Sequence, residues 1–321
     1  MTTDASNTDS SALEPTPADI PAVPRVSIGM PVYNGESFIR KALDSLLAQT
    51  FTDFELIISD NASTDGTEAI CREYAAKDKR IRYVRQTENR GAMANFQFVL
   101  NEAVGDYFMW AAADDWQTSD FIELLITELD KNPSFACMMA DVTNITDSVN
   151  ADSFLTVLED IRIEDVKKNW AKCRRRFFRN PTSNIFFCIY GIFRAEAIKS
   201  IELNYNNLHK YSFSMEIPLL AQIAIYGQIA SIPKPAKAYR RHELSEYNKE
   251  QSILKNKDRL LGFISVSLSL FLIALRSNLS FFQKLTLVGT TAVTGFIWMV
   301  RFFLTKINCF LKNLMSSRLK E

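Results

Sequence analysis

Short apolar segments alternate with helix-like segments over residues 25–113, and this alternation restricts the fold of the 321-residue chain more than any other feature. The apolar segments are VSIGMPVYN, FELIISD, IRYVRQ and DYFMWAAA. Between them, apolar residues recur at helical spacing in GESFIRKALDSLLAQTF, TEAICREYAAKD and AMANFQFVLNEA. Alternation of this kind is typical of βαβ units, so we predict an α/β fold whose mostly parallel sheet is covered by helices on both faces.

Polar residues follow three of the predicted strands, in segments 31–35, 60–67 and 114–116. Ligands of such sheets bind outside the carboxyl ends of the strands, so we expect these segments to meet at one edge. Asp114 and Asp115 are adjacent there, and two like charges so close together need a compensating partner. Simpler explanations are that 60–67 is an ordinary turn with a helix cap, and that one of the paired acids caps the next helix.

Composition narrows the kinds of chemistry that the chain can perform. Lys plus Arg and Asp plus Glu number 37 each, so no net charge favours nucleic acid, and we expect no nucleic-acid partner. The five cysteines are widely spaced without a CxxC pair, which argues against a zinc ribbon and a disulfide framework. With only His209 and His242 present, a multi-histidine metal site is excluded, and carboxylates must provide most of any catalysis.

Segment 26–67, followed by NRGAMANFQFVLNEAVGDYFMWAAADD, resembles the family 2 glycosyltransferases of the GT-A fold. The resemblance runs from about Val26 to about Asp141 and continues more weakly to about Ser245. It implies a nucleotide-sugar donor, Mg²⁺ or Mn²⁺ as cofactor, and inversion at the anomeric carbon. The expected organisation is a disordered tail at 1–24, a GT-A domain at 25–247 and a helical membrane-associating segment at 248–321. Within that domain, the nucleotide-sugar half covers about 25–141 and the acceptor half about 142–247.

The resemblance also assigns donor-binding roles, position by position. Asp115 is expected to bind the metal, and Asp114 the ribose or metal-bound waters. Asn61 replaces the second acid of a pair that often reads Asp-Asp; because an amide meets both the donor and the acceptor atoms of uracil, UDP is the favoured nucleotide. The expected donor-binding residues are Pro31, Val32, Tyr33, Asp60, Asn61, Arg90, Asp114, Arg241 and His242.

The catalytic base implied by the resemblance is Glu216, at the start of the apolar helix pattern EIPLLAQIAIY. Met215 stands where the family usually has a second acid, and Pro218 suits a first helical turn. The alternative is that Glu216 only complements the helix dipole. Further on, the basic residues of YRRH could neutralise diphosphate or face water, and Asp141 could face the acceptor or end a strand in a turn.

Two apolar runs follow, at 260–275 and 285–304, joined by RSNLSFFQK. The second approaches the roughly 20 residues that span a bilayer, and the first is shorter. Seven basic residues and no acidic one lie between positions 276 and 320. We therefore expect attachment to the cytoplasmic face of the cell membrane, as a spanning hairpin or in the interface. The alternative is a pair of amphipathic helices that cover the catalytic domain.

The sequence thus predicts a metal-dependent inverting glycosyltransferase that moves a sugar from a nucleoside diphosphate to a hydroxyl of a glycan or lipid-linked acceptor. Cell-surface polysaccharide synthesis is the expected setting. A nucleotidyltransferase is one alternative, although no phosphate-cradling glycine-rich loop follows the first strand. The other is a noncatalytic nucleotide-sugar or glycan binding module, which would not need Glu216.

Overall fold

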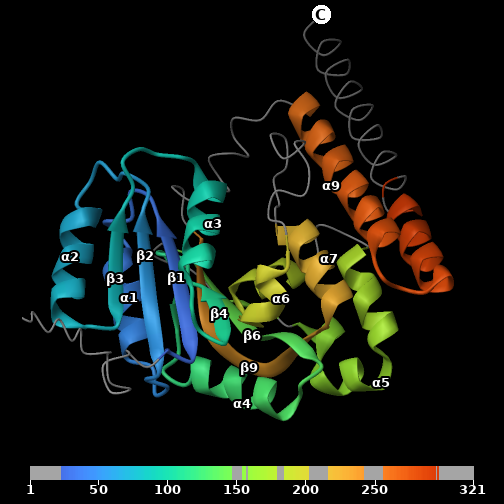
Figure 1. The fold of residues 1–321 in the computed structure, drawn as a ribbon, viewed down its shortest axis with the longest axis horizontal. Helices are drawn as coiled ribbons and strands as arrows, with labels where there is room; N and C mark the ends of the chain where they lie inside the picture. The colour runs from blue at the N-terminus through green and yellow to red at the C-terminus, as the bar shows by residue number, and fades with distance from the viewer. Residues whose placement is uncertain are drawn as a thin grey trace, which may run out of the picture.

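The computed structural model describes residues 23–146, 154–156, 158–178, 184–201, 216–241, 256–293 and 295. Within them, one sheet of nine strands has the order β3-β2-β1-β4-β8-β6-β9-β5, with β7 paired to β6 (Figure 1). The strands are β1 (Val26–Val32), β2 (Phe54–Asp60), β3 (Ile81–Arg85), β4 (Tyr107–Trp110), β5 (Trp116–Gln117), β6 (Phe135–Thr146), β7 (Phe154–Thr156), β8 (Ile192–Arg194) and β9 (Gln228–Arg241). The α-helices are α1 (Ile39–Leu47), α2 (Thr67–Lys77), α3 (Ala92–Glu102), α4 (Phe121–Lys131), α5 (Ile163–Arg174), α6 (Ala195–Lys199), α7 (Glu216–Tyr226) and α9 (Asn256–Arg276).

The four strands at the start of the chain pair in parallel, in the order β3-β2-β1-β4. Strand β1 is buried along nearly its whole length, as expected for a strand covered on both faces. Helix α3 packs against it so closely that a Cβ at Gly29 would lie 2.7 Å from a methyl carbon of Val99. The predicted α/β fold with a mostly parallel sheet flanked by helices is confirmed.

Beyond β4 the sheet becomes mixed. Strand β8 runs antiparallel to both β4 and β6, whereas β6 and β9 are parallel and long. The far end of β9 pairs with the two-residue strand β5, which begins directly after Asp115. This pairing brings residues 237–240 beside the adjacent acids at 114 and 115.

Helix α1 begins at Ile39, later than the helical pattern from residue 35 suggests. The backbone N–H groups of Gly35 and Glu36 donate to Thr67 Oγ1 at 2.8 Å and Asp65 Oδ2 at 3.1 Å. Because these groups are tied to the loop after β2, the first residues of the pattern form a turn and the helix starts after it.

Helix α9 and a second helix at residues 281–293 form a hairpin at the C-terminal end of the described chain (Figure 1). α9 contacts α7 of the sheet domain and buries Val266, Leu270 and Ile273. In the second helix, Leu287 and Thr291 are buried while Thr286 is exposed. None of the described helices combines the length and the apolar character that crossing a membrane requires. The run 285–304 continues past the described residues.

Candidate active site

The loops that follow β1 and β2 are joined by hydrogen bonds from backbone groups to side chains. Asn34, whose φ is 52°, donates its N–H to Ser63 Oγ at 2.9 Å and accepts the N–H of Thr64 on Oδ1 at 2.8 Å. Pro31 is half-buried, Val32 is buried, and Tyr33 leaves 42% of its surface exposed. The loop after β1 therefore exposes the ring of Tyr33, and the loop after β2 fixes its backbone through Ser63 and Thr64.

Asp60, at the end of β2, is completely buried. Its carboxylate accepts hydrogen bonds from Tyr83 Oη at 2.8 Å, Arg85 Nη1 at 2.9 Å and the N–H of Ser63 at 2.8 Å. These three bonds tie the end of β2 to β3 and to its own loop. Asp60 therefore stabilises the carboxyl end of β2 by hydrogen bonds within the protein.

Asn61 is buried as well and connects the loop after β2 with the loop after β3. Its Oδ1 accepts the N–H of Arg90 at 3.0 Å, and its Nδ2 donates to Asn89 Oδ1 at 2.9 Å. The side chain of Arg90 itself is exposed. The structure thus brings Tyr33, Asn61 and Arg90 to one edge, where the sequence places them.

The adjacent acids after β4 have different surroundings. Asp114 is half-buried, whereas Asp115 is 1% exposed. Oδ2 of Asp115 lies 3.0 Å from Nζ of the buried Lys237, and its Oδ1 accepts the N–H of Arg240 at 3.1 Å. Lys237 of β9 therefore supplies the positive charge that compensates one of the two adjacent acids, Asp115.

Glu216 and the two adjacent acids act electrostatically on the same side chain, that of Tyr190. Glu216 is the first residue of α7 and is half-buried. Burial raises the pKa of Tyr190 well above its ordinary value, and the negative charges of Asp115, Glu216 and Asp114 raise it further. Asp115, Glu216 and Asp114, which come from two distant parts of the chain, are therefore all near enough to Tyr190 for their charges to act on its phenol group.

Arg240 lies beside this group, with its guanidinium carbon 4.9 Å from the Phe38 ring centroid and 5.2 Å from that of Trp116. Contacts with two rings hold the cation at the edge of the site. Arg241 follows as the last residue of β9, and its side chain and His242 lie outside the described residues.

Asp141 has a structural role that the sequence does not indicate. It lies inside β6 and is 3% exposed, so the predicted strand-terminal turn is wrong. Arg162 Nη2 donates to its Oδ2 at 2.7 Å, and the N–H of Leu158 donates to its Oδ1 at 2.9 Å. These bonds attach the segment before α5 to the sheet.

A divalent cation could be held here by few protein groups. The described residues contain no cluster of three or more metal-ligating side chains. Mg²⁺ and Mn²⁺ bound with a nucleotide need only one or two carboxylates, because phosphates and water supply the remaining ligands. The half-buried Asp114 fits that requirement, whereas both oxygens of Asp115 are engaged by Lys237 and Arg240.

Sequence reasoning missed Lys237 and Tyr190. Lys237 stands in the strand pattern AKAY, where a lone lysine between apolar residues is the only available sign of a buried charge. Tyr190 ends the apolar segment FFCIY. Nothing in that segment distinguishes a site tyrosine from a core residue.

Comparison with known proteins gives a consistent family. The family model described as "Glycosyl transferase family 2" matches residues 27–201. The glycosyltransferase GlyA of Streptococcus pneumoniae is 36% identical over 105 residues, which cover 33% of this chain and 15% of that protein. An uncharacterized glycosyltransferase of Haemophilus influenzae is 27% identical over 71% of this chain and 70% of its own length.

Solved structures share the fold at low sequence identity. TarS 1-349 of S. aureus in complex with UDP-GlcNAc has a TM-score of 0.60 at 17% identity, covering 82% of this chain and 70% of that one. The mannosyltransferase PcManGT of Pyrobaculum calidifontis, in complex with GDP-Man and Mn²⁺, has a TM-score of 0.52 at 16% identity. The match covers 84% of this chain and 74% of PcManGT.

Proposed function

The chain belongs to glycosyltransferase family 2, and from that membership we propose that it transfers a sugar from a UDP-sugar to a hydroxyl of a glycan or lipid-linked acceptor, with inversion at the anomeric carbon. Cell-surface polysaccharide synthesis is the proposed setting. The observation that carries the proposal is that Lys237 of β9 contacts both Asp115 and Tyr190, and that the charges of Asp115, Glu216 and Asp114 all act on this tyrosine.

The nucleotide is proposed to lie on the loops that follow β1, β2 and β3. Tyr33 offers an exposed aromatic face for the base, and the exposed Arg90 can approach the donor's negative charge. Two neighbours in fold bind different nucleotides, UDP-GlcNAc in TarS and GDP-Man in PcManGT. UDP is the proposed nucleotide because an amide such as Asn61 can meet both the donor and the acceptor atoms of a uracil edge. To do so, the buried Asn61 would exchange its bonds to the N–H of Arg90 and to Asn89 Oδ1 for the base.

Mg²⁺ or Mn²⁺ is the proposed cofactor, and the neighbour PcManGT contains Mn²⁺. The metal, when bound, stabilises the charge that develops on the departing diphosphate. In this chain the half-buried Asp114 would hold it, while Arg240 supplies a fixed positive charge at the same edge.

Glu216 is proposed as the general base, which removes the proton of the acceptor hydroxyl as that oxygen attacks the anomeric carbon. Inversion requires the base and the leaving diphosphate on opposite sides of the sugar. Glu216 comes from α7 and Asp114 from the loop after β4, so the proposed base and the proposed metal-binding acid are supplied by different elements.

A panel of radiolabelled UDP-, GDP-, ADP- and dTDP-sugars, each with Mg²⁺ or Mn²⁺, tests this function. We expect one UDP-sugar to be consumed only when a metal is present and to label a glycan or lipid fraction. Release of pyrophosphate from a sugar phosphate and a nucleoside triphosphate would favour a nucleotidyltransferase. Tight nucleotide-sugar binding without any turnover, unchanged in Glu216→Gln, would favour a noncatalytic binding module.

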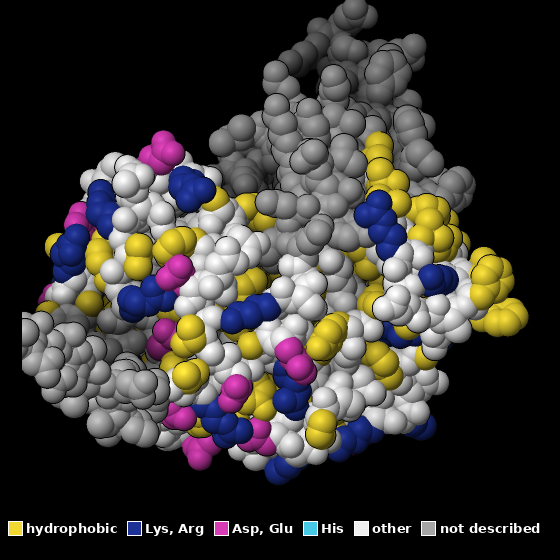
Figure 2. Space-filling model, in the orientation of Figure 1, with side chains coloured by type: hydrophobic (Ala, Val, Ile, Leu, Met, Phe, Trp, Pro, Cys, Tyr) yellow, Lys and Arg dark blue, Asp and Glu magenta, His cyan; other side chains and the backbone are white. Residues whose placement is uncertain are grey.

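We also propose that the C-terminal hairpin attaches the protein to the cytoplasmic face of the membrane. Its tip carries Phe281 and Phe282, which are 73% and 77% exposed, with Arg276 and Lys284 close by in sequence. Figure 2 shows hydrophobic side chains gathered over this hairpin. Basic residues outnumber acidic ones by seven to none between positions 276 and 320, which complements an anionic lipid surface.

Flotation with anionic and with neutral vesicles tests this attachment. We expect the full chain to float with the anionic vesicles, and Phe281→Glu/Phe282→Glu to stay at the bottom of the gradient. Val104→Glu, at a residue that is 57% exposed on the sheet domain, is the matched control and should float like the wild type. Equal flotation of the double variant and the wild type would exclude the hairpin tip as the anchor.

A further inference from the structure

Lys237 is an enclosed charge in the middle of a folded domain. The residue is 2% exposed, and its Nζ lies 3.0 Å from Asp115 Oδ2 and 4.8 Å from the ring centroid of Tyr190. A buried ammonium is costly unless it is paired, and replacing a buried ion pair with apolar residues often costs nothing. Packing alone therefore gives no reason for a lysine at this position.

The pair connects two parts of the candidate site. Asp115 ends the segment 111–115 that follows β4, whereas Lys237 belongs to β9 and pairs with Gln117 of β5. The N–H of Arg240 donates to the second oxygen of Asp115, so β9 holds this carboxylate at both oxygens. A shift of β9 relative to the loop would strain both contacts and would act on Asp114, the residue directly before Asp115.

We propose that Lys237 is a positioning residue for the donor site: it holds Asp115 as an internal anion, which fixes the loop and leaves Asp114 as the acid of the pair that faces the donor and its metal. The part that concerns the donor rests on the proposed function. The assignment departs from the sequence-based prediction that Asp115 binds the metal. The physical reason is that a metal would have to displace both Lys237 and the Arg240 N–H from a carboxylate with 1% exposure.

Hydrogen exchange tests the positioning directly, without any ligand. In Lys237→Met we expect the amides of residues 111–117 and of Arg240 to exchange about tenfold faster or more, since contacting residues are strongly coupled. Lys234→Met is the matched control, because Lys234 lies on the same strand and pairs with Asp120, but on the surface. Its exchange should match that of the wild type. If Lys237→Met behaves like Lys234→Met, the proposal fails.

Mn²⁺ binding in the presence of UDP, measured by electron paramagnetic resonance, tests the second part. Lys237→Met should weaken Mn²⁺ affinity by about 10- to 100-fold, the loss typical of residues that orient a ligand. Asp115→Asn/Lys237→Met removes both buried charges together with the ion pair that links β9 to the loop, so its affinity should fall only as far as that of Lys237→Met. Asp114→Asn, which removes the proposed ligand, should bind Mn²⁺ more weakly than either. A folded double variant as weak as Asp114→Asn would make Asp115 the ligand and overturn the proposal.

Two results separate this inference from the proposed function. If the wild-type protein binds no nucleotide with Mn²⁺, the proposed function fails, and the exchange measurement still decides the role of Lys237. If Lys237→Met alone does not fold, the double variant takes its place in both measurements. If the amides of residues 111–117 in the double variant exchange at the wild-type rate, the ion pair serves only to balance two buried charges. That result would refute the positioning role.

Discussion

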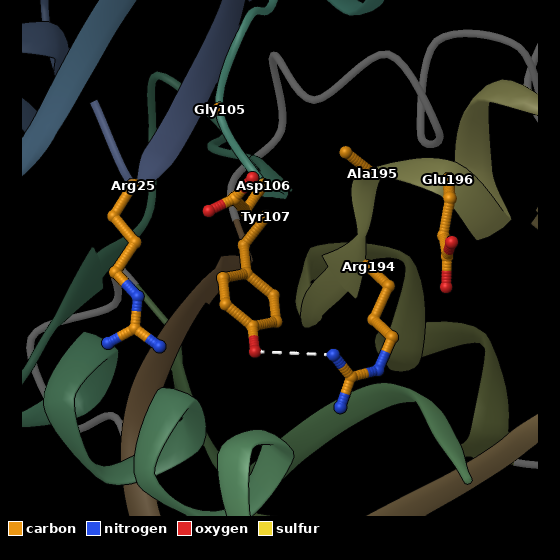
Figure 3. Close-up of a pocket in the computed structure, with 7 residues that line it drawn as sticks. All are labelled: Arg25, Gly105, Asp106, Tyr107, Arg194, Ala195 and Glu196. Carbon is orange, nitrogen blue, oxygen red and sulfur yellow. Dashed lines mark hydrogen bonds between the residues drawn. The ribbon is translucent and has the colours of Figure 1, made fainter. Parts of the chain in front are cut away.

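The two edges of the central sheet both collect charged side chains, but they do so differently. At the carboxyl edge, the charges of Asp115, Glu216 and Asp114 all act on Tyr190. At the opposite edge, Arg25, Tyr107 and Arg194 line a cavity of about 400 Å³ (Figure 3). Strand β4 connects the two groups, because it begins at Tyr107 at one edge and leads to Asp114 and Asp115 at the other.

At the opposite edge, Arg25, Asp130 and Arg194 form hydrogen bonds with other groups of the protein. Asp130 accepts hydrogen bonds from Arg25 at 2.6 Å and from Tyr107 at 2.7 Å. Arg194 donates to the carbonyls of Leu129 at 2.6 Å and Phe135 at 2.9 Å, around the end of α4. The carboxyl edge combines two adjacent acids with the buried Lys237, whereas the opposite edge places one acid between an arginine and a tyrosine. We therefore assign a reaction to the first edge and a stabilising role to the second.

The largest expected effect is that of Glu216→Gln at the carboxyl edge. The amide keeps the size of the side chain but accepts no proton, so the turnover number should fall by roughly 10²- to 10⁴-fold, as is usual for a general base. Donor affinity, measured by calorimetry, should hardly change. The matched control is Glu196→Gln, which alters a first-turn acid of α6 at the opposite edge and should leave turnover unchanged. Equal losses in the two variants would remove the contrast between the edges.

Tyr33→Ala should have the next largest effect. Stacking of a base on an aromatic ring contributes about 1–3 kcal/mol, so the KM for the donor should rise roughly tenfold with little change in kcat. Tyr226→Ala is the control, because Tyr226 is 50% exposed, close to the 42% of Tyr33. Steady-state kinetics with varied donor concentration measure both variants. An unchanged KM in Tyr33→Ala would place the base elsewhere on this edge.

Much of the carboxyl edge could be predicted from the sequence, because local patterns determine strands β1 to β4 and parallel strands bring their ends together. The contacts of individual residues could not. The bonds of the Asp60 carboxylate to Tyr83 and Arg85 on the next strand are one example. Arg240 lies 125 residues beyond the Asp115 to which it donates, and no local pattern records such a pairing.

The C-terminal runs illustrate a different limit. Their composition indicates a membrane span, an interfacial helix or a helix on the protein surface, and hydropathy alone does not distinguish these. The structure shows that α9 contacts α7 and that its Leu270 and Ile273 are buried, while Ile264 and Leu268 stay exposed. Tertiary contacts with another element therefore decide which face of the helix is covered.

Arg194→Met should lower stability without impairing catalysis. It removes charged hydrogen bonds to the carbonyls of Leu129 and Phe135, and bonds of this kind contribute about 1.5–3 kcal/mol each. Urea denaturation should show a loss of about 2 kcal/mol in the free energy of unfolding. Arg82→Met, which removes an exposed pair with Glu102, should cost under about 1 kcal/mol. A drop in turnover without loss of stability in Arg194→Met would give the opposite edge a functional role.

Asp130→Asn should have the smallest effect, and that effect should depend on pH. Burial acts to raise the pKa of Asp130, but hydrogen bonds from Tyr107 and Arg25 and the charge of Arg25 outweigh it, so the pKa lies below the ordinary 3.8. A carboxyl whose pKa is lower in the folded state stabilises the fold above its unfolded pKa and loses that contribution as the pH falls through the folded pKa. The wild type should therefore exceed Asp130→Asn in stability at pH 7 by less than about 1 kcal/mol, because the side chain is 39% exposed and water screens the pair. Urea denaturation at pH 7, 5 and 3 should show this difference shrinking at the acid end, and 1 M salt should reduce it at pH 7. A difference that grows toward pH 3 would show that Asp130 acts through its neutral form, and the charge matching assigned to this edge would be wrong.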